Sequence, residues 1–339
     1  MIGDFSKHQR MNLGYDIGDT KGAGDEFRYP DLKSYQDIPF DKYTKSPFKD
    51  FDHSPGMSTD DTQTFMAVEE LLISDKEFTK ENLADKIVEC YKRDPVKGMY
   101  HKSFQNILDS VNSGEEFIKK INPNSIRNGA ATRAVPIGVV PDIDTVVEYA
   151  IINASLTHDT SKGRASSVAV ALMSHMSFHY GYMYCDTEIF RAVHYGGDIH
   201  SYADIVRSII IPRVKLLDAE TATYMNDVLD MKKFDPVLLF GKEHSTKGVP
   251  CDGMRTVGAA LYLLTKFTSP KDILIESVKL GGDVDSVAAI SLGIGLVTDY
   301  YVGCLPSFLF DDLANHAYGR DYLLSLGDKL SSKFPYVKQ

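Results

Sequence analysis

Hydrophobic side chains recur at helical spacing through most of the chain. One predicted helix, which follows Thr79 as its N-cap, has four apolar side chains on one face: Leu83, Ile87, Cys90 and Tyr91. Residues 104–111 and 143–154 repeat this spacing, and the second segment follows Pro141-Asp142, a helix start signal. We therefore expect a helix in each of these segments.

Several other segments also favour helices. Residues 165–176 are apolar nearly all round, which predicts a buried central helix, and Ser269-Pro270 opens another. The best strand candidate, residues 208–214, is too short to build a sheet, and the chain has no fixed-period repeat. The pattern predicts an all-α fold, a compact bundle of many helices.

Residues 14–58 are rich in Gly, Pro, Asp, Ser and Tyr and show no sustained period. We expect an extended surface loop there, most clearly over residues 28–58, and long irregular loops often act as functional lids. No linker divides the chain, so residues 1–339 are expected to form a single domain.

Composition narrows the class of protein. With 43% hydrophobic residues among 339, the chain can bury a large core. A net charge of −10 without an extended basic cluster argues against general nucleic-acid binding. The longest apolar run is far shorter than the about 20 residues that span a bilayer, and the N-terminus lacks a secretory signal. We expect a soluble, cytoplasmic, monomeric protein that does not bind membranes.

The four cysteines are widely spaced and form no CxxC pair: Cys90, Cys185, Cys251 and Cys304. Neither a disulfide framework nor a thiolate zinc site is indicated.

Two acidic clusters carry the candidate chemistry. Residues 58–62 (Ser-Thr-Asp-Asp-Thr) and 281–286 (Gly-Gly-Asp-Val-Asp-Ser) each stand directly before a helical run. Helix capping is the plain interpretation, since Ser, Thr and Asp favour N-termini. A cap needs one acceptor, however, and the second cluster crowds two carboxylates and a hydroxyl behind a flexible glycine pair.

The clusters share one ligand chemistry. Each offers two carboxylates and a hydroxyl, which suits Mg²⁺, Mn²⁺ or Ca²⁺ better than zinc. Four carboxylates brought together would repel one another, and two divalent ions about 3.5–4 Å apart would neutralise them. Spacing alone does not establish that the clusters meet.

Six segments, in order, resemble motifs of the ADP-ribosylglycohydrolase family: residues 18–27 (GDTKGAGDEF), 59–62 (TDDT), 128–138 (NGAATRAVPIG), 157–158 (TH), 257–262 (VGAALY) and 281–289 (GGDVDSVAA). The resemblance covers roughly residues 14 to 306. It implies an all-α orthogonal bundle with two divalent cations, Mg²⁺ or Mn²⁺. It also implies hydrolysis that releases ADP-ribose from a modified protein or a related conjugate.

The resemblance also implies roles at matching positions. The implied metal ligands are Thr59, Asp60, Asp61, Asp283, Asp285 and Ser286, where Ser286 replaces the more usual Thr. The implied catalytic residues are Glu26, Asp60, Asp61 and Asp285. The implied ADP-ribose contacts are Asn128, Gly129, Ala130 and His158, and the backbone amides of the Gly-Ala turn suit a diphosphate.

Three departures from the family bear on mechanism. Lys97 stands where the nitrogenase-reductase-reactivating branch has a catalytic Asp, which favours a mechanism centred on Glu26, as in the branch acting on serine-linked ADP-ribose. Lys21 and Asp25 occupy positions where small or apolar residues are common. The loop from Arg28 to Pro55 is long, so target recognition is expected to be particular to this protein.

Other polar residues have structural interpretations. Arg133 fits either a phosphate contact or a buried ion pair that holds its loop. We expect four histidines without ligand spacing to be structural or exposed: His175, His179, His194 and His200. Some aromatic side chain must stack on adenine, and the sequence does not identify it.

Two alternatives remain at this stage. One is a catalytically silent ADP-ribose-binding or crystallin-like protein on the same fold, which would be marked by loss of metal ligands. The other is an unrelated Mg²⁺-dependent phosphohydrolase, whose DxD motif would follow a hydrophobic strand. Here Lys279-Leu280 ends a helix-like segment instead.

Overall fold

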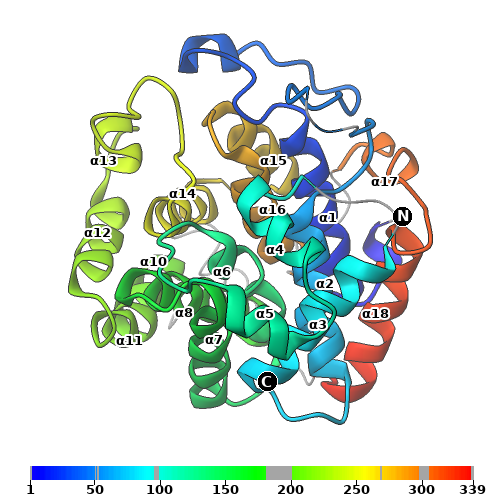
Figure 1. Ribbon diagram of the computed structural model, residues 1–339. Coiled ribbons are helices and arrows are strands. Elements are labelled where there is room, and N and C mark those ends of the chain that lie inside the picture. Colours follow the sequence, from blue (N-terminus) through cyan, green and yellow to red (C-terminus); the bar gives the residue numbers. More distant parts are fainter. Residues whose placement is uncertain are drawn as a thin grey trace.

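The computed structural model describes residues 2–49, 51, 53–94, 99–180, 201–267, 269–297 and 305–336. Across these ranges the chain forms helices and no strand, with two isolated β-bridges, so the all-α prediction is confirmed (Figure 1). The α-helices are α1 (Lys7–Ala23), α2 (Asp60–Ile73), α3 (Lys80–Arg93), α4 (Lys102–Asp109), α5 (Gly114–Lys120), α6 (Gly129–Thr132), α7 (Ile143–Thr157), α8 (Ser161–Tyr180), α10 (Tyr202–Ile205), α11 (Ile211–Lys215), α12 (Ala219–Asp230), α13 (Pro236–Phe240), α14 (Gly253–Lys266), α15 (Pro270–Lys279), α16 (Val284–Gly295), α17 (Phe308–Asp311) and α18 (Arg320–Lys333). Short 3₁₀ turns cover Ile2–Asp4, Leu32–Tyr35 and Val135–Val139, and Val206–Ile210 is a π-helical turn.

Most predicted helices form where the pattern placed them. Thr79 caps α3, Asp142 caps α7, and Ser269 caps α15 with Pro270 in its first turn. The apolar segment 165–176 lies within α8, which is buried along nearly its whole length. The weak strand candidate at 208–214 is helical instead.

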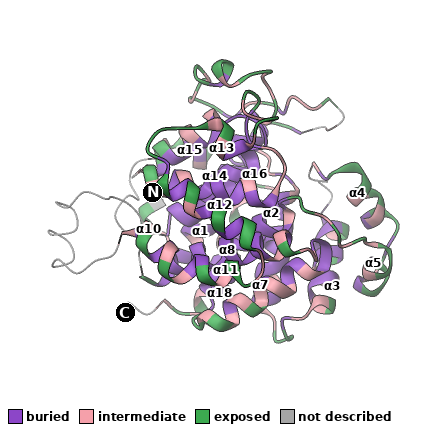
Figure 2. Cartoon of the chain, turned by 90° about the vertical axis from the view of Figure 1, so that its left-hand side faces the viewer, coloured by how far each residue is buried: buried purple, intermediate pink, exposed green. Residues whose placement is uncertain are grey.

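Three helices, α1, α8 and α16, form the centre of the molecule, where Figure 2 shows almost unbroken burial. The loop prediction for residues 14–58 was wrong over its first ten residues, because α1 runs to Ala23. This helix has no apolar stripe, since it is buried on all sides and carries polar residues that contact other elements. The described residues between 28 and 58 do follow the prediction, apart from one 3₁₀ turn.

Glycines on one face of α1 allow α16 to approach closely. A Cβ on Gly14 would lie 2.6 Å from the Leu292 carbonyl oxygen, and one on Gly18 would lie 2.3 Å from that of Ala288. A Cβ on Gly22 would lie 2.3 Å from Cα of Asp285. The four-residue spacing therefore forms a groove that holds the start of α16, with one acidic cluster, against α1.

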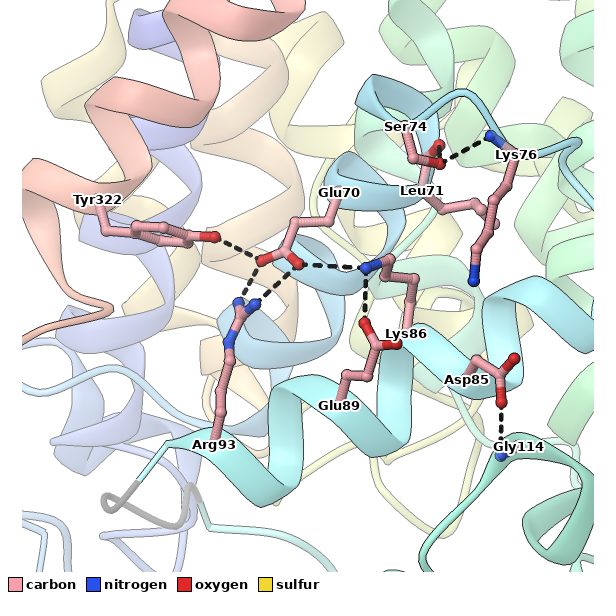
Figure 3. Close-up of polar contacts among 10 residues, drawn as sticks. All are labelled: Glu70, Leu71, Ser74, Lys76, Asp85, Lys86, Glu89, Arg93, Gly114 and Tyr322. Carbon is pink, nitrogen blue, oxygen red and sulfur yellow. Dashed lines mark hydrogen bonds and ion pairs between the residues drawn. The ribbon is translucent and has the colours of Figure 1, made fainter.

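The other acidic cluster begins α2, which is tied to its neighbours by a polar network around Glu70 (Figure 3). Arg93 of α3 donates to both carboxylate oxygens of Glu70, and Tyr322 of α18 donates to Oε1 at 2.7 Å. Lys86 completes an ion-pair chain between Glu70 and Glu89. The network fixes the orientation of α2, whose N-terminal end carries the acidic residues.

Helices α4 and α5 lie at the edge of the molecule and are largely exposed, as Figure 2 shows. Leu108 is the fully buried residue of α4, and Phe104 and Ile107 pack partly against the core. No helix among the described residues is long and apolar enough to cross a membrane.

Candidate functional site

The two acidic clusters meet. The Ser286 hydroxyl donates to Asp61 Oδ2 at 2.7 Å, which links the start of α16 to the start of α2. Glu26, Asp283 and Asp285 each offer a carboxylate oxygen, and these three atoms lie within 4.8 Å of one another. Together with Asp60 and Asp61 they line one side of a cavity of about 1150 Å³. The five carboxylates come from three segments distant in sequence.

Asp19 on α1 holds the first cluster in place. Its carboxylate accepts from the backbone N–H and the hydroxyl of Thr59, at 2.9 and 2.7 Å, and from the same two groups of Thr62, at 3.2 and 2.6 Å. Thr59 also caps α2 by accepting from the Asp61 amide. Thr59 therefore does the capping, and the carboxylates of Asp60 and Asp61 remain available to the cavity.

A glycine turn positions the second cluster. Gly281 and Gly282 have φ of +64° and +78°, a region that favours glycine. A parallel bridge to Val249 fixes the turn, with the Asp283 amide donating to the Val249 carbonyl at 2.9 Å. Asp283 stands at the N-cap of α16 without making a side-chain cap bond, so capping does not account for its carboxylate.

The same turn places Glu26, because the Phe27 amide donates to the Gly282 carbonyl at 3.0 Å. The two atypical residues of this segment form an ion pair. Lys21 Nζ lies 2.5 Å from Asp25 Oδ2, both side chains are buried, and Arg28 pairs with the other oxygen of Asp25. The departures at Lys21 and Asp25 thus compensate each other.

The carboxylates on the acidic side of the cavity are so close together that their charged forms repel one another. Burial raises the pKa of Asp60 to about 7 and, together with neighbouring carboxylates, raises the pKa values of Asp61, Asp285 and Glu26 well above their usual range. A nearby divalent cation would offset the repulsion between these carboxylates. Because all the donor atoms are oxygens, they fit hard ions such as Mg²⁺ or Mn²⁺.

The predicted ligand-binding residues lie on the cavity wall with one exception. Asn128, Gly129 and His158 line it, whereas Ala130 is buried behind it and accepts from Asn153 through its carbonyl. The Asn128 amide group donates to Asp283 Oδ2 at 2.9 Å, so this side chain holds the acidic cluster. Thr59 also lies behind the lining residues.

Arg133 holds the Asn128–Ala130 turn without an ion pair. Its guanidinium donates to the carbonyl of Gly129, to both the carbonyl and the side-chain oxygen of Asn153, and to the Thr157 hydroxyl. Burial lowers its pKa to about 10. The expected buried ion pair of Arg133 was wrong, because neutral acceptors take the place of a carboxylate, although the side chain does hold its loop.

His158 is a neutral side chain that is held on one side by Thr157. Burial, reinforced by the charges of Arg133 and Arg127, lowers its pKa to about 3. The Thr157 hydroxyl accepts from Arg133 and lies 2.6 Å from His158 Nδ1, so this nitrogen is engaged within the protein. The other ring nitrogen, Nε2, lies on the side of Gly129, where a ligand in the cavity can reach it.

Some site residues were missed from the sequence. Asp19 lies within the matched Gly18–Phe27 motif, so its position was a usable signal, whereas Cys251, Phe104 and Arg127 line the cavity from segments without a motif. His175 and His179 bond backbone carbonyls, as expected for structural histidines. Lys97, His194, Cys185 and Cys304 fall outside the described residues, and His200 does as well.

Comparison with known proteins gives a consistent result. A family model described as ADP-ribosylglycohydrolase matches residues 4–337. The chain is 24% identical over 267 residues to ADP-ribosylhydrolase ARH3 of Xenopus tropicalis, covering 70% of this chain and 71% of that protein. It is 23% identical over 269 residues to ADP-ribosylhydrolase ARH3 of Gallus gallus, covering 72% and 70%. A solved structure titled "ADP-ribosylglycohydrolase-related protein complex" has the same fold, with a TM-score of 0.63, 17% identity and coverage of 97% of this chain and 98% of that one.

Proposed function

Because this chain belongs to the ADP-ribosylglycohydrolase family, we propose that it is a metal-dependent hydrolase that cleaves the glycosidic bond between ADP-ribose and a modified target. The target would be a protein side chain or a related ADP-ribosyl conjugate. The observation that carries the proposal is the meeting of the two acidic clusters through Ser286 and Asp61 at one side of a large cavity.

The residues that would hold two Mg²⁺ or Mn²⁺ ions are Thr59, Asp60, Asp61, Asp283, Asp285 and Ser286. When bound, the ions would supply Lewis-acid chemistry to the distal ribose and to water. Thr59 donates its hydroxyl hydrogen to Asp19, which leaves an oxygen lone pair for a cation.

Glu26 is the candidate for proton transfer. It is half-buried, and burial together with Asp283 and Asp60 raises its pKa well above the usual range, the direction expected for a group that exchanges a proton with the reacting atoms. Asp60, Asp61 and Asp285 surround the same space and would stabilise positive charge that develops on the sugar as the bond breaks. Asn128, Gly129, Ala130 and His158 would position the ligand, with His158 Nε2 facing it beside Gly129.

The test is release of ADP-ribose from arginine-, serine- and thymidine-linked conjugates with Mg²⁺ or Mn²⁺. Asp283→Ala and Asp285→Ala should abolish release, whereas Asp328→Ala, on an exposed carboxylate of α18, should leave it unchanged. Full activity of the Asp283→Ala/Asp285→Ala double variant, or of the wild type in excess chelator, would contradict metal-dependent hydrolysis. Binding of ADP-ribose without release from any conjugate would favour a silent binding protein instead.

A further inference from the structure

A buried tyrosine without a hydrogen-bond partner lies behind the two acidic clusters. Tyr15 is fully buried on α1, and its hydroxyl makes no hydrogen bond with a described residue. Three other buried tyrosines, Tyr43, Tyr100 and Tyr224, each donate to an oxygen 2.7 or 2.8 Å away. A buried donor without a partner destabilises the folded state, and in native proteins such a group often serves a function or a ligand.

The ring of Tyr15 is held between two helices. It stacks on Phe65 of α2 with ring centroids 4.2 Å apart and an angle of 27° between the ring planes. On α16, a Cβ added to Gly293 would lie 3.2 Å from Cβ of Tyr15, so the glycine leaves room for the tyrosine. Tyr15 therefore lies where α1, α2 and α16 meet, and close packing leaves its side chain little freedom to turn away.

Each of these three helices also carries a carboxylate near the Tyr15 hydroxyl. Asp19 lies one turn after Tyr15 on α1, and Asp61 lies one turn before Phe65 on α2, so each shares a helix face with one of the stacked rings. Asp285 lies in the first turn of α16. Burial raises the pKa of the tyrosine hydroxyl well above its usual range, and the charges of Asp61, Asp19 and Asp285 raise it further. The hydroxyl therefore keeps its proton and faces acidic groups.

Among the groups around this hydroxyl, Asp61 has room for another donor. The Thr132 hydroxyl lies near Tyr15 and acts to lower its pKa, but it already donates to the Gly129 carbonyl at 3.2 Å. The Asp61 carboxylate accepts a side-chain bond from Ser286 through Oδ2. Because an ionised carboxylate offers about four acceptor positions, it can take a second donor.

We propose that Tyr15 is a positioning residue of the cation site, and that its hydroxyl donates to the Asp61 carboxylate when the acidic clusters bind divalent cations. The inference rests on the proposed function in one respect, namely that the clusters bind such ions. A carboxylate that binds a cation is ionised and acts only as an acceptor, and a donor behind it fixes the direction of its oxygens. The same hydroxyl thus destabilises the metal-free protein and stabilises the cation-bound one.

The experiment compares Tyr15→Phe with the wild type in two measurements, the melting temperature without metal and the affinity for Mn²⁺ by calorimetry. Phenylalanine keeps the ring on Phe65 and removes only the hydroxyl, so the metal-free variant should melt at the same temperature or higher. Its affinity for Mn²⁺ should fall about 10- to 100-fold, as it does when a group that orients a ligand is lost. The rise in melting temperature that Mn²⁺ produces should shrink accordingly.

Tyr224→Phe is the matched control. Tyr224 is also buried, lies on α12 away from the residues that line the cavity, and donates to the Leu239 carbonyl at 2.7 Å. Loss of that bond should lower the melting temperature of the metal-free protein and leave the affinity for Mn²⁺ unchanged. The two variants remove the same atom from a buried tyrosine, yet only Tyr15→Phe should weaken Mn²⁺ binding and only Tyr224→Phe should lower the melting temperature.

Three outcomes would overturn the inference. Equal Mn²⁺ affinity in Tyr15→Phe and the wild type would show that the hydroxyl does not orient the cation site. A lower melting temperature of metal-free Tyr15→Phe would show that the hydroxyl has a partner without any cation, such as a buried water. In both cases release of ADP-ribose by the wild type and its loss in Asp283→Ala would leave the proposed function standing. A wild type that binds no Mn²⁺ and releases no ADP-ribose would remove both proposals.

Discussion

The Ser286 hydroxyl lies 2.7 Å from Asp61 Oδ2 and joins two segments that are 225 residues apart in the chain. This hydrogen bond connects the second acidic cluster directly to the first. Because Ser286 also offers oxygen lone pairs, the same group can bridge the clusters and contribute to a cation site.

We expect Ser286→Ala to weaken Mn²⁺ binding about 10- to 100-fold, since loss of a group that orients a ligand has effects of that size. Ser286→Thr keeps the hydroxyl and should retain affinity within a few-fold. Calorimetric titration of the two variants with Mn²⁺ checks this. Equal affinity in Ser286→Ala and the wild type would show that the hydroxyl has no part in cation binding.

Asp19 should be as important for cation binding as the predicted ligands, although it lies behind them. Asp19→Asn replaces an acceptor by a donor that faces four donors from Thr59 and Thr62, so we expect weaker Mn²⁺ binding, by about 10- to 100-fold, and a lower melting temperature. Asp16→Asn is the matched control, three residues earlier on α1. Burial raises the pKa of Asp16 to about 8, so this carboxyl is already largely neutral at pH 7 and its amide should be tolerated.

The sequence predicted those features of the fold and of the site that depend on neighbouring residues in the chain. Helix starts at Thr79, Asp142 and Ser269 follow from capping chemistry, which acts over three or four residues. The shared ligand chemistry of the two acidic clusters could also be inferred from residue types.

Features that depend on packing between distant segments could not be predicted from the sequence. That the clusters meet depends on the glycine groove of α1, where Gly14, Gly18 and Gly22 admit α16, and glycine spacing alone does not name a partner helix. Because α1 is buried all round, it carries no amphipathic signal, and its polar residues made it look like a loop. Phe104 reaches the cavity through the placement of α4 and Arg127 through that of the segment before α6, and no local pattern encodes either placement.

The buried pair of Lys21 and Asp25 should stabilise the segment that carries Glu26. Lys21→Met leaves the Asp25 carboxylate buried with only Arg28 beside it, and we expect a loss of about 3–5 kcal/mol in the free energy of unfolding. The double variant Lys21→Met/Asp25→Asn removes both charges and should recover a large part of that loss. Urea denaturation of Lys21→Met, Asp25→Asn and the double variant measures the coupling free energy between the two side chains. Additive effects would show that the two side chains do not act as a pair.

Glu69 provides a test of pH dependence away from the acidic cavity. It is fully buried on α2, accepts from the side-chain amide of Asn12 at 3.0 Å, and burial raises its pKa well above the usual range. Its Oε1 is buried without a partner among the described residues, so ionisation of Glu69 would leave a charged oxygen without a donor.

The native state therefore keeps the proton of Glu69 when the unfolded chain has released it, above about pH 4.3. Stability from this group is complete below that pH and declines as pH rises toward the raised native pKa, by at most about 1.4 kcal/mol per pH unit. Glu69→Gln does not titrate, so its free energy of unfolding relative to the wild type should rise steadily between pH 5 and pH 8. Glu148→Gln, on an exposed side chain of α7, should show no such trend. Because the carboxylates of the cavity titrate equally in the wild type and both variants, the difference isolates Glu69, and a flat difference for Glu69→Gln would show that this carboxyl is ionised in the native state.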